Sequence, residues 1–233
     1  MKRREFVATC AAAAGSVALP TAGQGGNLTA RMYSRAKLVD ERRQPMRLVQ
    51  LQAGRNYVFE YPFAATPCFL LRLRGPAASA IDLKTEAGSP YRWQGGIGPG
   101  HDVVAYSAIC AHKMTYPTRQ VSFIGYRDEP SPVAGRGRVI ACCSDRSVYD
   151  PAAGARVVSG PAPQPLATIL LEHDPKSDEV FAVGTFGGEM FAEFFRKYEF
   201  RLQLEQGDRA RNAVEGLAVV RELETYSTQW AKC

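Results

Sequence analysis

Short runs rich in β-branched and aromatic residues alternate with glycine- and proline-containing segments along the middle of the chain. Runs of this kind, bounded by turn residues, predict β-strands. They lie at residues 47–51, 57–61, 68–73, 103–108, 121–124, 139–141, 168–172 and 180–183. Many short strands separated by frequent turns predict a mostly β protein, an antiparallel sandwich or barrel.

The hydrophobic period changes after Gly187-Gly188. Apolar residues then recur at helical spacing, which predicts an amphipathic helix over residues 189–198. Residues 213–226 predict a second helix, weakened by Gly216. The tail over residues 188–233 is therefore expected to be helical. Its apolar faces fit two roles, packing on the protein's own sheet or docking onto a partner subunit.

The first residues have the pattern of an export signal. Lys2, Arg3 and Arg4 precede Phe6 and a weakly apolar, alanine-rich stretch. This order is typical of a twin-arginine signal, which we assign to residues 1–26 and which is either cleaved or kept as an anchor. Residues 27–46 are polar and basic and are expected to be a linker arm. The signal predicts a periplasmic protein, attached to the inner membrane if the signal is retained.

Length and charge narrow the possible functions. The 233 residues suffice for one domain with tails, and 45% hydrophobic residues allow a packed core. The net charge of +6 falls to +4 without the charged residues at positions 2–5, so no strong nucleic-acid footprint remains. Only three histidines are present, which excludes a histidine-rich zinc enzyme. A histidine-containing site must use His101, His112 or His173.

Two loops carry candidate metal ligands. The first is Cys110-Ala111-His112, which follows the strand predicted at residues 103–108. The second runs from Cys142 to Asp150 and follows the strand predicted at 139–141. A cysteine and a histidine two residues apart can both reach one compact inorganic centre. A second such loop on an adjacent hairpin can close the site from the other side.

These loops resemble those of Rieske [2Fe–2S] proteins, which read Cys-x-His and Cys-x-x-His followed by x-Ser-x-Tyr-Asp. In such centres two thiolates hold one iron and two imidazoles hold the other. Three ligand positions are matched here, by Cys110, His112 and Cys142. Ser147 and Tyr149 match the family's serine and tyrosine, whose hydroxyls hydrogen-bond a bridging sulfide and a cysteine sulfur and raise the potential.

A third segment extends the resemblance. Residues 159–166 are similar to the Gly-Pro-Ala-Pro loop that covers the cluster, with Gly160 and Pro161 at its start. The resemblance implies a Rieske-type domain over residues 47–187. It also implies an antiparallel β-sandwich or barrel with an inserted cluster-binding subdomain at about 104–166.

The departures from the family pattern leave four interpretations of the site open. Asp145 stands at the fourth ligand position, where its carboxylate would lower the potential unless Lys113 or Arg146 compensates. The site is then a [2Fe–2S] cluster held by Cys110, His112, Cys142 and Asp145, or a cluster that uses Cys143 as its fourth ligand. It is otherwise a single metal ion such as zinc, or a site that has lost its metal.

The remaining cysteines carry no assignment to the site. The positions where many Rieske proteins have a loop-to-loop disulfide are Thr115 and Ser144, so that clamp is missing. Cys68 is expected to be a buried thiol on a strand. Cys233 is terminal and is expected to be free. An exported protein can form disulfides, but the sequence does not determine a pairing.

Within the family, three segments are similar to the small subunit of arsenite oxidase-type enzymes: residues 66–71, 95–107 and 182–184. This resemblance implies a non-catalytic electron-transfer subunit between a molybdopterin-type catalytic subunit and a periplasmic c-type cytochrome. Two alternatives remain. One is a structural or assembly subunit that has lost the cluster. The other is a quinol-oxidising cytochrome bc-type Rieske protein, whose second-loop imidazole takes up the quinol proton, a role that Asp145 does not reproduce.

Overall fold

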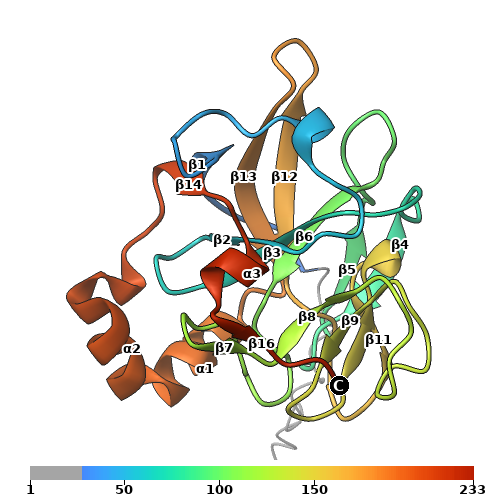
Figure 1. Cartoon of the computed structure of the whole chain (residues 1–233), viewed down its shortest axis with the longest axis vertical. Coiled ribbons are helices and arrows are strands. Elements are labelled where there is room, and N and C mark those ends of the chain that lie inside the picture. Colours follow the sequence, from blue (N-terminus) through green and yellow to red (C-terminus); the bar gives the residue numbers. More distant parts are fainter. Residues whose placement is uncertain (1–27) are drawn as a thin grey trace, which may run out of the picture.

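The computed structural model of the chain describes residues 28–233. Within this range the protein is mostly β, as predicted, and its largest sheet has eight strands in the order β14–β1–β13–β12–β6–β3–β2–β15 (Figure 1). These strands are β1 Arg31–Val39, β2 Tyr57–Glu60, β3 Pro67–Arg72, β6 Val103–Ser107, β12 Thr168–Asp174, β13 Glu179–Phe186, β14 Gly216–Val219 and β15 Arg221–Glu222. Only Val220 separates the two edge strands β14 and β15, so the sheet curls until its edges nearly meet.

The central strands of this sheet are buried on both faces. On β3, Cys68 and Leu70 face one hydrophobic core, whereas Phe69 and Leu71 face a second core on the other side. Successive side chains of a strand point to opposite faces, so a strand covered on both sides has a nearly continuous apolar sequence. The apolar run at 68–73 is therefore explained by its central position.

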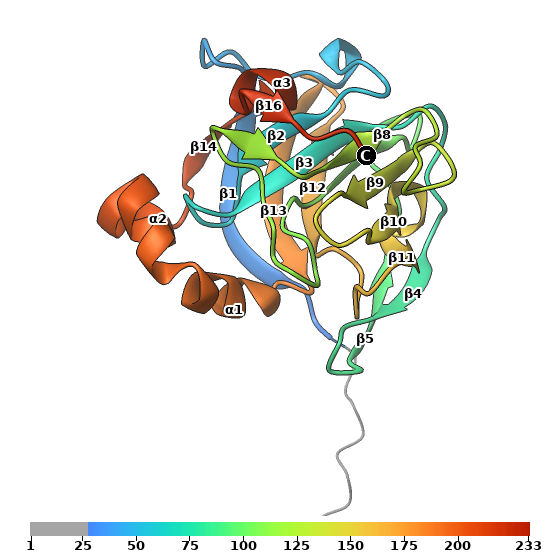
Figure 2. The same cartoon turned by 60° about the horizontal axis from the view of Figure 1, so that its bottom comes forward.

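A smaller β subdomain covers the face of the second core. It contains a sheet of order β11–β10–β9–β8, formed by β8 Ile124–Arg127, β9 Val139–Cys142, β10 Val148–Asp150 and β11 Arg156–Ser159. The hairpin of β4 (Ile81–Lys84) and β5 (Pro90–Trp93) lies beside it, and β7 (Val121–Ser122) pairs with β16 (Gln229–Trp230). Figure 2 shows this subdomain on the opposite side of the large sheet from helices α1 and α2.

The predicted amphipathic helix at residues 189–198 is confirmed as α1 (Met190–Lys197). Its buried side chains pack on the protein's own sheet, where Phe195 meets Phe63 edge to face at 5.5 Å. α2 follows directly at Glu199–Gln206 and leaves Phe200 exposed. The apolar face of α1 therefore belongs to the core of the described chain.

Three expectations from the sequence differ from the structure. Residues 47–51 contain a short 3-10 helix (Leu48–Gln50) in place of a strand. Residues 213–226 form β14, β15 and only a four-residue helix α3 (Leu223–Tyr226), because Gly216 has a φ of +69° and the following residues pair in parallel with β1. The expected linker arm at 27–46 includes β1, whose outer half is solvent-exposed and therefore polar in sequence.

Further 3-10 turns occur at Pro151–Ala153 and Gly207–Arg211. The twin-arginine signal expected at residues 1–26 lies outside the described residues. Among residues 28–233, no helix combines the length and apolar character needed to cross a bilayer.

Candidate metal centre

The first site loop begins at the end of β6 and closes on a buried cysteine. The amide of Cys110 donates to the carbonyl of Thr115 at 2.9 Å, and the amide of Met114 donates back to the carbonyl of Cys110 at 2.8 Å. Met114 has a φ of +57°, a conformation that is uncommon for residues with a side chain. This tight turn directs Cys110 inward and leaves His112 at the surface.

The second site loop joins β9 to β10 and has the same backbone form. The amide of Cys142 donates to the carbonyl of Ser147 at 2.9 Å, and the amide of Arg146 donates back to the carbonyl of Cys142 at 2.8 Å. Arg146 has a φ of +64°, at the position equivalent to Met114 in the first loop. Two loops of equal form therefore present one buried cysteine each, and strained backbone of this kind clusters at functional sites.

The two loops meet at the carboxylate of Asp145. Its Oδ2 lies 3.2 Å from Cys110 Sγ and 3.0 Å from His112 Nδ1, and its Oδ1 accepts a 2.9 Å hydrogen bond from the amide of Ser147. The sulfurs of Cys110 and Cys142 and a carboxylate oxygen of Asp145 all lie within 4.8 Å of one another. The structure thus brings together the four residues that the sequence selected as ligands.

Burial separates His112 from the other three side chains. Cys110 and Cys142 have no exposed surface, whereas the His112 side chain is 39% exposed. The Asp145 side chain lies between them and is almost fully covered. His112 also borders a groove of about 470 Å³. Other residues that line this groove are Met114, Pro163, Gln164, Glu189, Met190 and Glu193. The imidazole is therefore the part of the site within reach of another molecule.

The charges in this cluster favour a bound cation. A hydrogen bond from Cys142 lowers the pKa of Cys110, while the same contact together with burial raises the pKa of Cys142. Burial acts to raise the pKa of Asp145, but hydrogen bonds from the Ser147 amide and the Cys110 thiol outweigh it, so this pKa lies below its usual value. Deprotonating both thiols beside this carboxylate would place three negative charges in one buried place, and a bound cation would balance them.

Tyr149 supplies a hydroxyl to the inner cysteine. Its oxygen accepts a hydrogen bond from the amide of Ala111 at 3.1 Å and lies 3.3 Å from Cys110 Sγ. Because the amide occupies the oxygen as acceptor, the phenol proton is free to point at the sulfur. Burial raises the pKa of Tyr149, which keeps that proton in place.

The hydrogen bonding of the Ser147 hydroxyl indicates whether the residues of the site fit an iron–sulfur group. Its Oγ is fully buried and has no hydrogen-bond partner among the described residues. A buried hydroxyl without a partner costs about 1–3 kcal/mol. The sulfide of such a group would be an acceptor of the kind this hydroxyl lacks. The sulfur-rich donor set and the orphaned hydroxyl therefore fit a [2Fe–2S] group.

The segment after β11 packs against the second site loop. Gly160 has a φ of +91°, and a Cβ on it would lie 2.5 Å from the Arg146 carbonyl oxygen and 2.6 Å from Ser147 Cα. Only glycine allows this approach. Pro161 follows and is exposed. Gly160 therefore takes the place beside the loop that the sequence resemblance implies, while Pro161 makes no contact with the four candidate ligands that the structure records.

Sequence reasoning missed one covalent bond beside the site. Cys143 forms a disulfide with Cys233, so Cys143 is not the fourth ligand and Cys233 is not free. The pair is 90 residues apart in sequence, and the number of cysteines was the only available signal. Cys68 is a buried strand thiol, as expected. His101 is exposed, and His173 contacts Asp178 at 2.8 Å, so neither belongs to the site.

No protein-family model matches the chain. Among solved structures, the chain is similar to the soluble domain of the Rieske protein II (SoxF) from Sulfolobus acidocaldarius, with 26% sequence identity. The alignment covers 66% of this chain and 78% of that chain, with a TM-score of 0.45.

Proposed function

We propose that this protein is an electron carrier that holds a Rieske-type [2Fe–2S] cluster between its two site loops. The observation that carries the proposal is the meeting of Cys110, Cys142 and His112 at the Asp145 carboxylate, beside the orphaned Ser147 hydroxyl. The cluster would supply a one-electron redox couple at this place.

The burial of the two cysteines and the 3.0 Å contact between His112 and Asp145 support separate roles for the two pairs. Cys110 and Cys142, both fully covered, would bind the inner iron, and His112 and Asp145 would bind the outer one. Since His112 Nδ1 faces Asp145, its Nε2 is the ring nitrogen left to hydrogen-bond solvent or a partner. The half-exposed imidazole would be the point at which electrons enter and leave.

The resemblance of three sequence segments to arsenite oxidase-type small subunits supports a choice of redox partners. We propose a periplasmic complex in which this chain relays electrons from a molybdopterin-type catalytic subunit, as in arsenite oxidase-type enzymes, to a c-type cytochrome. The segments at 66–71 and 95–107 and the export signal at 1–26 support this assignment. The chain itself then performs no bond-making chemistry.

A kinetic experiment tests the relay. Protein reduced with dithionite and freed of excess reductant is mixed with an oxidised c-type cytochrome, and the haem absorbance is followed. Transfer of one electron per chain, and loss of transfer in the variant Cys110→Ser, is the expected result. Failure of the intact protein to reduce the cytochrome would contradict the relay.

One alternative has an observation in its favour. The three donor atoms of Cys110, Cys142 and Asp145 are close enough together to surround a single metal ion, and two thiolates with an imidazole and a carboxylate suit zinc. Such a protein would be a structural subunit. Metal analysis separates the two, because zinc without labile sulfide fits only this alternative.

A further inference from the structure

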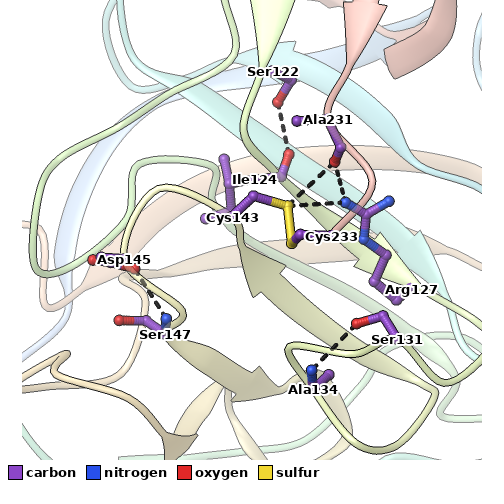
Figure 3. The surroundings of a disulfide bond; sticks show 10 residues. All are labelled: Ser122, Ile124, Arg127, Ser131, Ala134, Cys143, Asp145, Ser147, Ala231 and Cys233. Carbon is purple, nitrogen blue, oxygen red and sulfur yellow. Dashed lines mark hydrogen bonds between the residues drawn. A yellow bond between two sulfur atoms is a disulfide. The ribbon is translucent and has the colours of Figure 1, made fainter.

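The last residues of the chain run alongside the second site loop. We call residues 229–233 the C-terminal strap. Its first two residues form β16, which pairs in parallel with β7, and the amide of Ala231 donates to the carbonyl of Ser122 at 2.9 Å. The strap ends at Cys233, which is bonded to Cys143 (Figure 3). Cys143 directly follows Cys142, so the chain terminus is covalently attached to a ligand-bearing loop.

A buried arginine joins the strap to the subdomain. The guanidinium of Arg127, on β8, contacts the Ala231 carbonyl oxygen and lies 3.5 Å from Cys143 Sγ. It also stacks over the ring of Trp230 at 4.2 Å. Figure 3 shows Arg127, the Ala231 carbonyl and the disulfide together, with Asp145 and Ser147 farther along the same loop.

The strand beneath the strap is shaped to receive it. A Cβ on Gly125 would lie 2.7 Å from the indole nitrogen of Trp230, so the absence of a side chain lets the indole pack onto β8. The amide of Cys143 donates to the carbonyl of Phe123 at 2.7 Å, which places the cysteine next to the same strand. The strap therefore occupies a specific place.

The two site loops differ in what supports them. The first loop continues into Tyr116, which is buried and packs edge to face on Phe194 of α1 at 5.0 Å. In the second loop, Ser144 and Arg146 are exposed on either side of Asp145. The disulfide at Cys143 links this loop covalently to the strap. A cross-link between distant segments reduces the number of conformations that both segments can adopt.

We propose that the C-terminal strap is a positioning device for Cys142 and Asp145. Its disulfide holds the second site loop in the form that binds metal, so opening the disulfide loosens the loop and speeds metal loss. A dithiol reductant opens it: the S–S bond breaks, two electrons and two protons pass to the sulfurs of Cys143 and Cys233 to give two thiols, and the reductant is oxidised to its own disulfide. A groove of about 490 Å³ is lined by Cys233, Arg127 and Trp230 and gives such a reagent a path. The proposal rests on the proposed function for the identity of the metal group.

Hydrogen exchange in metal-free protein tests the strap independently of the cluster. The double variant Cys143→Ser/Cys233→Ser is compared with wild type and with Cys68→Ser, which removes a buried thiol that has no part in the strap. We expect roughly tenfold faster amide exchange over residues 142–149 in the double variant only. Exchange over residues 110–116 should stay unchanged. Equal exchange over 142–149 in all three proteins would overturn the proposal.

A second pair of measurements keeps the proposal testable if the double variant does not fold. Wild-type protein is folded first and its disulfide is then reduced, and Trp230→Ala loosens the strap while the disulfide remains. Both should speed exchange in the second loop, the reduction more strongly. In protein loaded with iron and sulfide, iron release to a chelator should also quicken on reduction. If a stable cluster forms and iron release is unchanged on reduction, the proposed role of the strap is wrong and the electron-carrier function is unaffected. If no cluster forms, the proposed function is wrong and the hydrogen-exchange result still tests the strap.

Discussion

His112 Nδ1 lies 3.0 Å from Asp145 Oδ2, a contact that joins the tips of two loops 33 residues apart in sequence. The same oxygen lies 3.2 Å from Cys110 Sγ. The Asp145 carboxylate thus contacts both the buried ligand Cys110 and the partly exposed ligand His112. Its charge, and not only its position, distinguishes this centre from one built with two imidazoles.

Replacing Asp145 with histidine should keep the cluster and raise its potential. The substitution removes one negative charge next to the iron, which is worth on the order of 100–200 mV for a one-electron couple at this separation. Ser144→His is the matched control, since it places an imidazole at an exposed position of the same loop. Redox titration followed by visible spectroscopy measures the potential of both variants. An unchanged potential in Asp145→His would mean that Asp145 is not coordinated.

Tyr149→Phe should lower the potential and also destabilise the protein. The loss of a hydrogen bond to Cys110 Sγ disfavours the more negative reduced state, by tens of millivolts and at most about 130 mV. The amide of Ala111 would lose its acceptor, at a cost of about 1–3 kcal/mol in the free energy of unfolding. Redox titration and urea unfolding of the metal-free protein check the two effects. A lower potential without destabilisation would show that the amide contact is unimportant.

Ser147→Ala should lower the reduction potential without destabilising the metal-free protein. Its hydroxyl has no partner among the described residues, so the metal-free variant should be as stable as wild type or more stable, by about 1 kcal/mol. The loaded variant should have a lower potential, because the donor to the bridging sulfide is lost. The same titration and unfolding measurements apply. A potential equal to that of wild type would argue against a sulfide beside Ser147.

Gly160→Ala should displace the second site loop. The left-handed φ alone costs about 1–3 kcal/mol, and the added Cβ collides with the backbone of Arg146 and Ser147. Gly135→Ala is the control, since Gly135 also has a positive φ, of +64°, but has nothing within 4 Å of the new Cβ. The iron content after reconstitution should fall in Gly160→Ala and not in Gly135→Ala. Equal iron content in both would show that the loop tolerates the collision.

The central strands and the first helix could be predicted because their sequence periods are intact. β3 and β6 are apolar along most of their length, since both of their faces are covered, and α1 keeps its apolar residues at helical spacing. β1 was missed because its outer half is exposed and polar. β14 was missed because its pairing with β1 joins segments about 180 residues apart, which no local pattern records.

The ligand candidates could be predicted from spacing, but their mutual arrangement could not. The loop motifs selected Cys110 and Asp145 separately, while their contact depends on how the small β subdomain packs on the large sheet. The bond between Cys143 and Cys233 depends on the course of the C-terminal strap, which begins only after α3. Long-range pairing of this kind is fixed by the tertiary structure.

The iron and labile sulfide content of the purified protein, exported or reconstituted, tests the central claim most directly. A [2Fe–2S] cluster held by Cys110, His112, Cys142 and Asp145 predicts two irons and two sulfides per chain and a rhombic electron paramagnetic resonance signal after dithionite reduction. Colourless protein without iron after reconstitution, or protein with zinc and no sulfide, would contradict it.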